Sequence, residues 1–331
     1  DYEVIVVDDG SIDSTPHILS IYRDPQFKIV HEEKNRGVSH ARNRGAELAQ
    51  AEILLFLDAD VLIPSSLLGD VWDFMNSHPD AAACQGRYGP RSYYPDVFSG
   101  YKNAVLAFRG AEAGGQDINY IHTACVAIRK PIFIKFRFNE KLRRREDIDL
   151  GLRLFHAGHP IQSLPSMEVI HKKRLGCRGF TRYQFLSARE IALDQFARGE
   201  QNFGRELASP KQALYKKLWL FRPVLATALV GLFAVKFLVL GSQTSRLWDF
   251  LLTVILMLSI ALEWRFRTYL LKNTSFKMSV AAFFLYFYDG LITATGVATA
   301  LITTLLGQRQ NTGAGSTAAV TETSPEKASP P

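Results

Sequence analysis

The fold is decided by the stretch Ile53-Leu54-Leu55-Phe56-Leu57-Asp58-Ala59-Asp60. Its apolar part predicts a buried β-strand, and the two carboxylates that follow are separated by one residue. Because side chains alternate along a strand, Asp58 and Asp60 are expected to project the same way and could share one hard divalent cation. The stretch therefore predicts a site for a metal that carries phosphates. A strand that ends in an ordinary polar turn remains the alternative.

A second acidic turn, Asp8-Asp9-Gly10-Ser11, lies upstream, directly after the apolar run Glu3-Val4-Ile5-Val6-Val7. We expect this run to be a buried strand. The next helix is expected to begin with Thr15 as its N-cap and Pro16 in its first turn. Ligands of open α/β sheets bind outside the carboxyl ends of the strands, so both acidic turns should open onto one crevice. A capped turn that binds no ligand is the alternative.

A third acidic motif, Glu146-Asp147-Ile148-Asp149, opens an expected amphipathic helix whose Leu150, Leu154 and Phe155 fall on one face. Asp147 would lie in the first turn, where the helix dipole favours a charged carboxylate. A carboxylate that reaches into a cleft from this position is a candidate general base. Plain N-terminal capping of the helix is the alternative.

Together these motifs resemble those of the inverting glycosyltransferases of family 2, which have the fold called GT-A. The matching segments lie within residues 1–175 and are Val7 to Thr15, Asn35 to Gly45, Asp58-Ala59-Asp60 and Glu146 to Leu150. The resemblance implies an α/β, Rossmann-like nucleotide-diphospho-sugar transferase domain, here followed by C-terminal transmembrane helices. It also implies an enzyme that transfers a sugar from a nucleotide-sugar donor.

The resemblance assigns roles to individual residues. The expected donor-binding residues are Asp8, Asp9, Ser11, Arg42 and Asp58. In the family, the aspartates that match Asp8 and Asp9 lie against the nucleotide base and ribose.

The remaining roles concern the metal and the acceptor. Asp60 would ligate Mg²⁺ or Mn²⁺ under the diphosphate, and His171 would complete the metal site. Such a cation stabilises the negative charge that builds on the leaving group. Asp147 would deprotonate the acceptor hydroxyl, which typically contributes about 10²–10⁴-fold to the rate. His122-Thr123-Ala124 stands where the family more often has a Gly-rich run, in the far wall of the donor pocket, so the motifs do not identify the sugar.

Three long apolar runs follow Gly204: Leu218 to Leu240, Leu247 to Trp264 and Ser279 to Leu306. Each is near the roughly 20 residues that span a bilayer. We therefore expect a catalytic domain over residues 1–212, a membrane domain with three transmembrane helices over residues 213–308, and a disordered tail over residues 309–331. A buried hairpin is the alternative for the first two runs.

Basic residues flank these runs unevenly, and the positive-inside rule then predicts a multi-pass protein of the inner or plasma membrane with a cytoplasmic catalytic domain. The residues that carry this prediction are Lys211, Lys216, Lys217, Arg222, Arg265, Arg267, Lys272 and Lys277. The net charge of +7 is then mostly a membrane signature, and we expect no nucleic-acid partner. The three scattered cysteines suit a reducing cytoplasm.

Departures from the family narrow the reaction. Processive synthases carry a Gln-x-x-Arg-Trp motif, and the nearest match here, Gln184 to Arg189, lacks the Trp and has the wrong spacing. Single-sugar transfer to a lipid or lipid-linked acceptor is therefore expected. The first strand of the family's fold has no counterpart before Asp1, so we also expect an N-terminally truncated chain.

Two other functions stay open at this point. A haloacid-dehalogenase-like phosphatase also carries Asp-x-Asp after an apolar strand, with Asp58 as nucleophile and Asp60 as acid and base. A membrane scaffold with a degenerate transferase domain is the non-enzymatic alternative.

Overall fold

The computed structural model describes residues 1–113, 115, 117–142, 144–198, 222–234, 236 and 246–314. The described chain divides into two compact units. The first contains residues 1–177 and 258–285, and the second contains residues 178–198, 222–257 and 286–314. All of the acidic motifs lie in the first unit.

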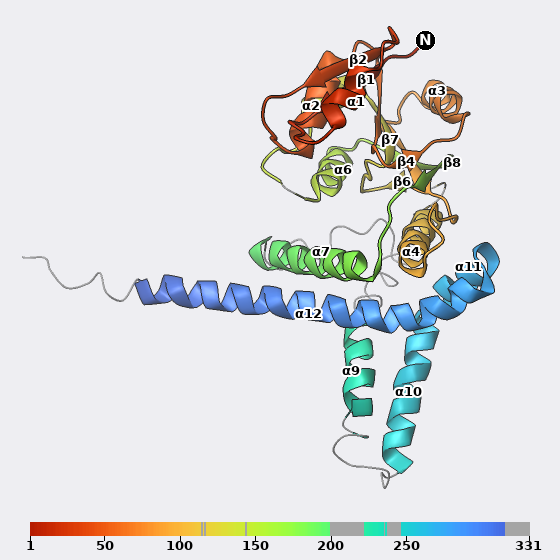
Figure 1. Ribbon diagram of the computed structural model, residues 1–331, viewed down its shortest axis with the longest axis vertical. Coiled ribbons are helices and arrows are strands. Elements are labelled where there is room, and N and C mark those ends of the chain that lie inside the picture. The colour runs from red at the N-terminus through yellow and green to blue at the C-terminus, as the bar shows by residue number, and fades with distance from the viewer. Residues whose placement is uncertain are drawn as a thin grey trace, which may run out of the picture. The chain divides into compact units, whose positions relative to one another are not determined.

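A mixed β-sheet forms the centre of the first unit, which confirms the predicted α/β architecture (Figure 1). The pairing of β5 with β8 is parallel, and the other pairings of this sheet are antiparallel. Its strand order is β3 (Ile53–Leu57), β7 (Cys125–Arg129), β5 (Ala83–Tyr88), β8 (Ile161–His171) and β4 (Val61–Leu62), with β6 (Asp117–Ile118) on β8. β1 (Val4–Asp8) and β2 (Phe27–His31) form a separate parallel pair.

Helices flank these strands in the first unit and make up the second. The first unit contains α1 (Thr15–Ser20), α2 (Val38–Leu48), α3 (Leu67–Ser77), α4 (Val97–Ala113), α5 (Lys130–Phe136), α6 (Glu146–His156) and α11 (Trp264–Asn273). The helices α7 (Cys177–Arg198), α9 (Arg222–Ala234), α10 (Arg246–Leu262) and α12 (Phe276–Ala314) lie wholly or partly in the second unit.

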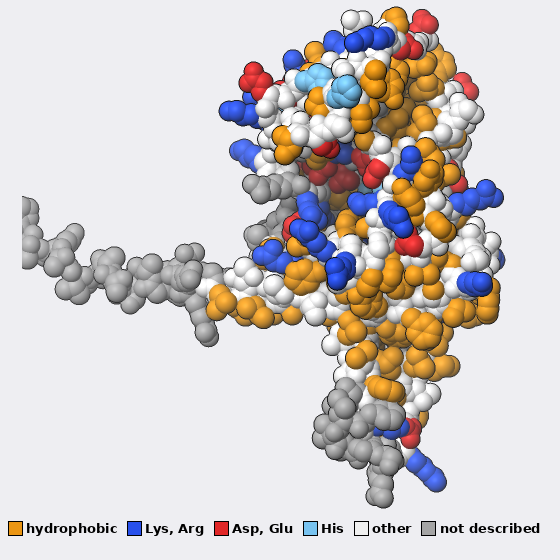
Figure 2. Space-filling view, in the orientation of Figure 1, with side chains coloured by type: hydrophobic (Ala, Val, Ile, Leu, Met, Phe, Trp, Pro, Cys, Tyr) orange, Lys and Arg blue, Asp and Glu red, His pale blue; other side chains and the backbone are white. Residues whose placement is uncertain are grey.

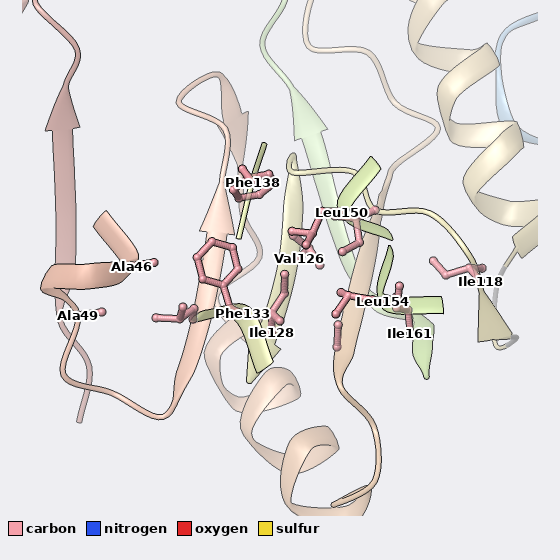
Figure 3. Close-up of a cluster of buried hydrophobic side chains, with 13 residues drawn as sticks. Ala46, Ala49, Ile118, Val126, Ile128, Phe133, Phe138, Leu150, Leu154 and Ile161 are labelled. Carbon is pink, nitrogen blue, oxygen red and sulfur yellow. The ribbon is translucent and has the colours of Figure 1, made fainter. Parts of the chain in front are cut away.

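The alternation of side chains along β7 builds two cores, one on each face of the sheet. Val126 and Ile128 belong to the cluster drawn in Figure 3, where they meet side chains of α2, α5 and α6. Cys125 and Ala127 belong to the opposite cluster, which α3 covers with Leu67 and other side chains. The sheet is thus buried on both faces, so the ends of its strands are the places left for a site.

Two local predictions need correction. Phe155 is 40% exposed, whereas Leu150 and Leu154 of the same helix are fully buried, because the apolar face of α6 is narrower than its spacing suggested. The N-cap position of α1 is Ser14, and Thr15 is its first helical residue. The backbone N–H of Thr15 donates to Asp13, which replaces the cap that we expected from the Thr15 hydroxyl.

Among the described residues, one helical segment is long and apolar enough to cross a membrane, Phe276–Leu306 of α12. The shorter apolar segments Val224–Phe233 and Trp248–Leu262 lie in α9 and α10. At 1.5 Å per residue, a helix of 17 residues such as α10 spans about 26 Å, less than the roughly 30 Å of a bilayer core. We predicted three transmembrane helices, and among the described residues one helical segment meets the length and composition that a span requires.

Parts of the membrane prediction lie outside the described residues. These are the remainder of the first predicted span, the loop that follows it, the basic residues Lys211, Lys216 and Lys217, and residues 315–331 of the predicted tail. Hydrophobic side chains are prominent over α10 and α12 in Figure 2, and Phe250, Met257 and Phe284 are more than 60% exposed. Exposed apolar surface of this kind marks contact with a membrane or a partner.

Candidate active site

Arg42 joins two of the acidic motifs. Its guanidinium, carried by α2, donates a hydrogen bond of 2.9 Å to Oδ1 of Asp58, which follows β3. It donates another of 2.7 Å to Oε1 of Glu146, the first residue of α6. The Arg42 and Glu146 side chains are only 16% and 11% exposed. Arg42 and Asp58, both predicted to bind the donor, are thus brought together. The pairing with Glu146 was not predicted, because it depends on how α2 and α6 pack.

Asp60 has a different partner from Asp58. Its Oδ2 lies 3.3 Å from Nε2 of His171, because β4 pairs Val61 with His171 at the end of β8. Burial lowers the pKa of His171, although the Asp60 carboxylate opposes this shift by favouring the charged ring. The structure therefore brings the two predicted metal ligands together and keeps the imidazole neutral at pH 7.

The pair fits a divalent cation that is held mainly by its substrate. Carboxylate oxygens and water suit Mg²⁺ and Mn²⁺, and neutral imidazole is a common metal ligand. The Asp60 side chain is 44% exposed, so a ligand can reach it. Within the described ranges, no group of three or more His, Cys, Asp or Glu side chains gathers for a metal. The other coordination positions would therefore fall to phosphate oxygens and water.

Asp147, the second residue of α6, lies beside a histidine from the segment before β7. Nδ1 of His122 is 3.5 Å from Oδ2 of Asp147, and the other carboxylate oxygen accepts the backbone N–H of Ile148 over 2.8 Å. Burial raises the pKa of Asp147, but the contact with His122 and the other favourable interactions outweigh it, so the pKa lies below its ordinary value. Asp147 is therefore ionised at neutral pH, as a base must be.

Close packing fixes this contact. A Cβ at Gly151 would lie 2.6 Å from Cα of Tyr120 and from the backbone nitrogen of Ile121, so α6 rests directly on the chain that leads to His122. The backbone N–H of His122 donates to Oε1 of the buried Gln85 over 2.6 Å. Sequence reasoning did not connect His122 with Asp147. The only indication in the sequence was that His122-Thr123-Ala124 stands where the family more often has a Gly-rich run.

The predicted nucleotide-binding residues Asp8, Asp9 and Ser11 form a cluster of their own after β1. Asp8 is 6% exposed and accepts the backbone N–H of Ser11 over 3.1 Å. Nδ1 of His31 lies 3.0 Å from the other Asp8 oxygen. The contacts with Ser11 and His31 lower the pKa of Asp8.

Asp9 shapes the loop that leads into α2. It accepts the backbone N–H groups of Arg36 and Gly37 over 2.9 and 2.7 Å. Gly37 has a φ of 98°, a conformation that favours glycine. Since α2 begins with the next residue and carries Arg42, Asp9 helps to position the Arg42 guanidinium.

A pocket opens beside the pair formed by His122 and Asp147. Its enclosed volume is about 30 Å³, and the hollow around it opens to solvent. Its walls come from β5, α4, β7, β8 and the segment before β7, and its polar side chains include Arg87, Arg109, Tyr120 and His122. On the face drawn in Figure 2, a group of Asp and Glu side chains lies recessed below the surrounding surface.

The family model described as "Glycosyl transferase family 2" matches residues 1–137. Residues 1–137 thus form a glycosyltransferase family 2 domain. The matched residues run from β1 through α5 and include Asp8, Arg42, Asp58 and Asp60. The family resemblance carried by the motifs is confirmed, and the match gives the phosphatase alternative no support.

Curated relatives of the family 2 domain match parts of the chain. The succinoglycan biosynthesis protein ExoU of Rhizobium meliloti is 29% identical over 175 residues, which are 47% of this chain and 49% of ExoU. The glucosyl-dolichyl phosphate glucuronosyltransferase of Haloferax volcanii is 21% identical over 140 residues, which are 40% of this chain and 44% of that protein. The chain thus spans about half the length of these relatives.

A solved structure extends the likeness beyond the family 2 domain. The mannosyltransferase PcManGT from Pyrobaculum calidifontis, in complex with GDP-Man and Mn²⁺, superposes with a TM-score of 0.54 at 20% identity. The superposition covers 87% of this chain and 78% of PcManGT. This likeness supports the GT-A-like fold of the mixed sheet.

Proposed function

We propose that this protein is an inverting, metal-dependent glycosyltransferase that moves a single sugar from a nucleotide-sugar donor to a lipid or lipid-linked acceptor. The proposal rests on how the acidic motifs are brought together. Arg42 joins Asp58 to Glu146, and Glu146 is the residue before Asp147. Asp60 lies beside His171. The proposed metal ligand Asp60 and the candidate base Asp147 would then act at one end of the sheet, as sugar transfer requires.

On the donor side, Asp60 and His171 would hold Mg²⁺ or Mn²⁺ under the diphosphate. The bound cation supplies charge stabilisation for the departing nucleoside diphosphate. Asp8, Asp9 and Ser11 would border the nucleotide. The Arg42 charge is already balanced by Asp58 and Glu146, so we assign Arg42 a positioning role next to the donor.

On the acceptor side, Asp147 would activate the attacking hydroxyl. Attack on the face of the anomeric carbon opposite the diphosphate gives inversion, and a base is needed on that face. The ionised state of Asp147 supports this role. An acceptor that is itself an ionised phosphate needs no deprotonation, and Asp147 would then only orient it.

Three observations favour an acceptor at a membrane. The segment Phe276–Leu306 could span a bilayer, α10 exposes Phe250 and Met257, and the Haloferax relative bears the name of an enzyme for a dolichyl phosphate glycolipid. We further propose that α9 and α10 enter the membrane with α12. Lys236 and Asp249 form an ion pair, which would lower the penalty of placing either charge in a membrane. Glycosylation-site or cysteine-accessibility mapping of the loops tests this topology.

The function is tested by the release of nucleoside diphosphate from membranes that contain the chain. A panel of nucleotide sugars is supplied with Mn²⁺, with Mg²⁺ or with a chelator. We expect turnover with one donor, loss of turnover with the chelator, and loss in Asp60→Ala and Asp147→Asn. Asp73→Ala, which removes an exposed carboxylate of α3, is the control. Turnover that survives both substitutions, or no turnover with any donor, contradicts the proposal.

A further inference from the structure

We propose that the proton of the acceptor hydroxyl is taken by Nε2 of His122, and that Asp147 acts by orienting this imidazole and stabilising its charged form. This inference rests on the proposed function, but the proton moves to His122 rather than to the carboxylate of Asp147. Family motifs point to the carboxylate alone. In this chain a histidine contacts that carboxylate and also lines the pocket.

The orientation of the ring is the first argument. Nδ1 is the atom that faces Asp147, at 3.5 Å from Oδ2. An Nδ1–H that points to a carboxylate leaves Nε2 with its lone pair free to accept a proton. The same arrangement makes histidine the base and aspartate its orienting partner in serine proteases.

His122 is also more accessible to solvent than Asp147. The His122 side chain is 46% exposed, whereas that of Asp147 is 20% exposed. His122 lines the pocket beside the pair, and Asp147 is not among the lining residues. A hydroxyl that approaches from the pocket would therefore meet the more exposed imidazole before the carboxylate.

The segment that carries His122 is held in place by its neighbours. The His122 backbone is held by Gln85, and α6 packs closely on the same segment because Gly151 lies against Tyr120 and Ile121. A catalytic pair needs such support, since a displacement of about 1 Å can lower the rate by about 100-fold.

The charges around His122 are consistent with a neutral base that becomes cationic during the reaction. Asp147 of α6 is the acidic group in contact with it, and the Tyr120 ring lies 5.2 Å away. Arg87 of β5 and Arg109 of α4 line the same pocket, together with the buried thiol of Cys125. Arg87 is paired with Glu168 at 3.3 Å, so part of its charge is already balanced.

The step balances without any further reactant. The acceptor O–H bond breaks as its oxygen bonds to the anomeric carbon, and the proton moves to Nε2 of His122. The bond from the anomeric carbon to the diphosphate oxygen breaks, and its electron pair leaves with the nucleoside diphosphate. The imidazolium that forms is stabilised by Asp147 until it loses its proton to solvent.

The pH dependence of turnover tests the inference, with the donor that the panel identifies and the acceptors present in the membranes. For the wild type we expect kcat to fall toward acid pH, because a protonated imidazole cannot accept the proton of the hydroxyl. In His122→Asn we expect kcat to fall by about 10²–10⁴-fold and this acidic limb to disappear, with the donor KM unchanged. His156→Asn, at the exposed other end of α6, is the matched control.

A second variant and a double substitution separate chemistry from misfolding. His122→Gln should show the same loss at an unchanged thermal unfolding midpoint. The variant with both His122→Asn and Asp147→Asn should be no worse than the poorer single variant within about threefold, because the pair acts as one unit. A His122→Asn rate within about threefold of the wild type, with its acidic limb intact, overturns the inference.

A measurement without substrate tests the pair itself. Nitrogen NMR of histidine-labelled protein in detergent micelles, assigned with His122→Asn, should show Nε2 unprotonated at pH 8. Asp147→Asn should change the ring-nitrogen resonances of His122, because the contact with Nδ1 is altered, whereas Asp73→Asn should not. A protonated Nε2, or no response to Asp147→Asn, overturns the inference. Absence of wild-type turnover contradicts the proposed function, whereas turnover that survives His122→Asn contradicts this inference alone.

Discussion

Asp60 lies 3.3 Å from His171, while Asp58, two residues earlier, is bonded to Arg42. The carboxylates of one Asp-x-Asp triplet therefore have different surroundings. Asp58 is balanced by a guanidinium, whereas Asp60 has an imidazole whose pKa is lowered by burial. Asp60 is thus the carboxylate with charge available for a cation.

This difference predicts the metal dependence of the two aspartates. Asp60→Asn should raise the Mn²⁺ concentration needed for half-maximal turnover by at least about 10-fold, the loss that even outer-shell changes cause. The same titration on Asp73→Asn should match the wild type, because that side chain is exposed on α3. Equal Mn²⁺ dependence in Asp60→Asn would mean that another group holds the cation.

Arg42 should matter for stability as well as for activity. Arg42→Ala leaves the Asp58 and Glu146 carboxylates without their cation, and removing one partner of a buried pair typically costs about 3–5 kcal/mol. We expect a value near the low end, because Asp58 is 30% exposed. Arg44→Ala, on the same helix but 41% exposed, should change stability by less than about 1 kcal/mol. Denaturant unfolding of the purified chain compares the two, and equal effects would contradict the structural role of Arg42.

Gly151 gives a prediction about the packing of α6. A Cβ at this position would lie 2.6 Å from backbone atoms, so Gly151→Ala should destabilise by about 1–3 kcal/mol. It should also lower turnover, because α6 must move away from the segment that carries His122. Gly69→Ala is the control: nothing lies within 4 Å of its Cβ, and alanine favours a helix by about 0.5–1 kcal/mol. Thermal unfolding midpoints that move in the same direction would show that the contact at Gly151 is not tight.

Asp8 gives a prediction about pH. Hydrogen bonds from Ser11 and the contact with His31 lower its folded-state pKa below the unfolded value near 3.9. Ionised Asp8 therefore stabilises the fold above about pH 4, and this contribution is lost as the pH falls through the lower folded pKa. Asp8→Asn should be less stable than the wild type at pH 7 by about 1–3 kcal/mol. The gap should close in acid, and a gap that persists at pH 2 would contradict this origin.

Local patterns predicted the elements that carry the site. The strand Ile53–Leu57 has the bounds that its apolar run indicated, and the first strand is shifted by one residue, to Val4–Asp8. These predictions succeed because alternation and turn chemistry act over a few residues. Composition also indicated the apolar C-terminal segments but not where each helix ends.

Long-range packing could not be predicted in the same way. The contact between His122 and Asp147 depends on a glycine of α6 that no motif marks. The arginines of the pocket, Arg87 and Arg109, come from β5 and α4, which lie outside every motif. Such groups meet only after the sheet order is fixed, and no spacing in the chain records that order.

Helix α6 places two consecutive carboxylates on different neighbours, because Glu146 binds Arg42 whereas Asp147 lies beside His122. A rotation of this helix by a fraction of a turn would disturb both contacts at once. If Arg42 and Asp147 have the roles proposed above, mutations that adapt the protein to a new donor through Arg42 would also alter how it binds acceptors. Donor and acceptor preferences in this lineage should therefore evolve together, through compensating changes in α2, α6 and the segment that carries His122.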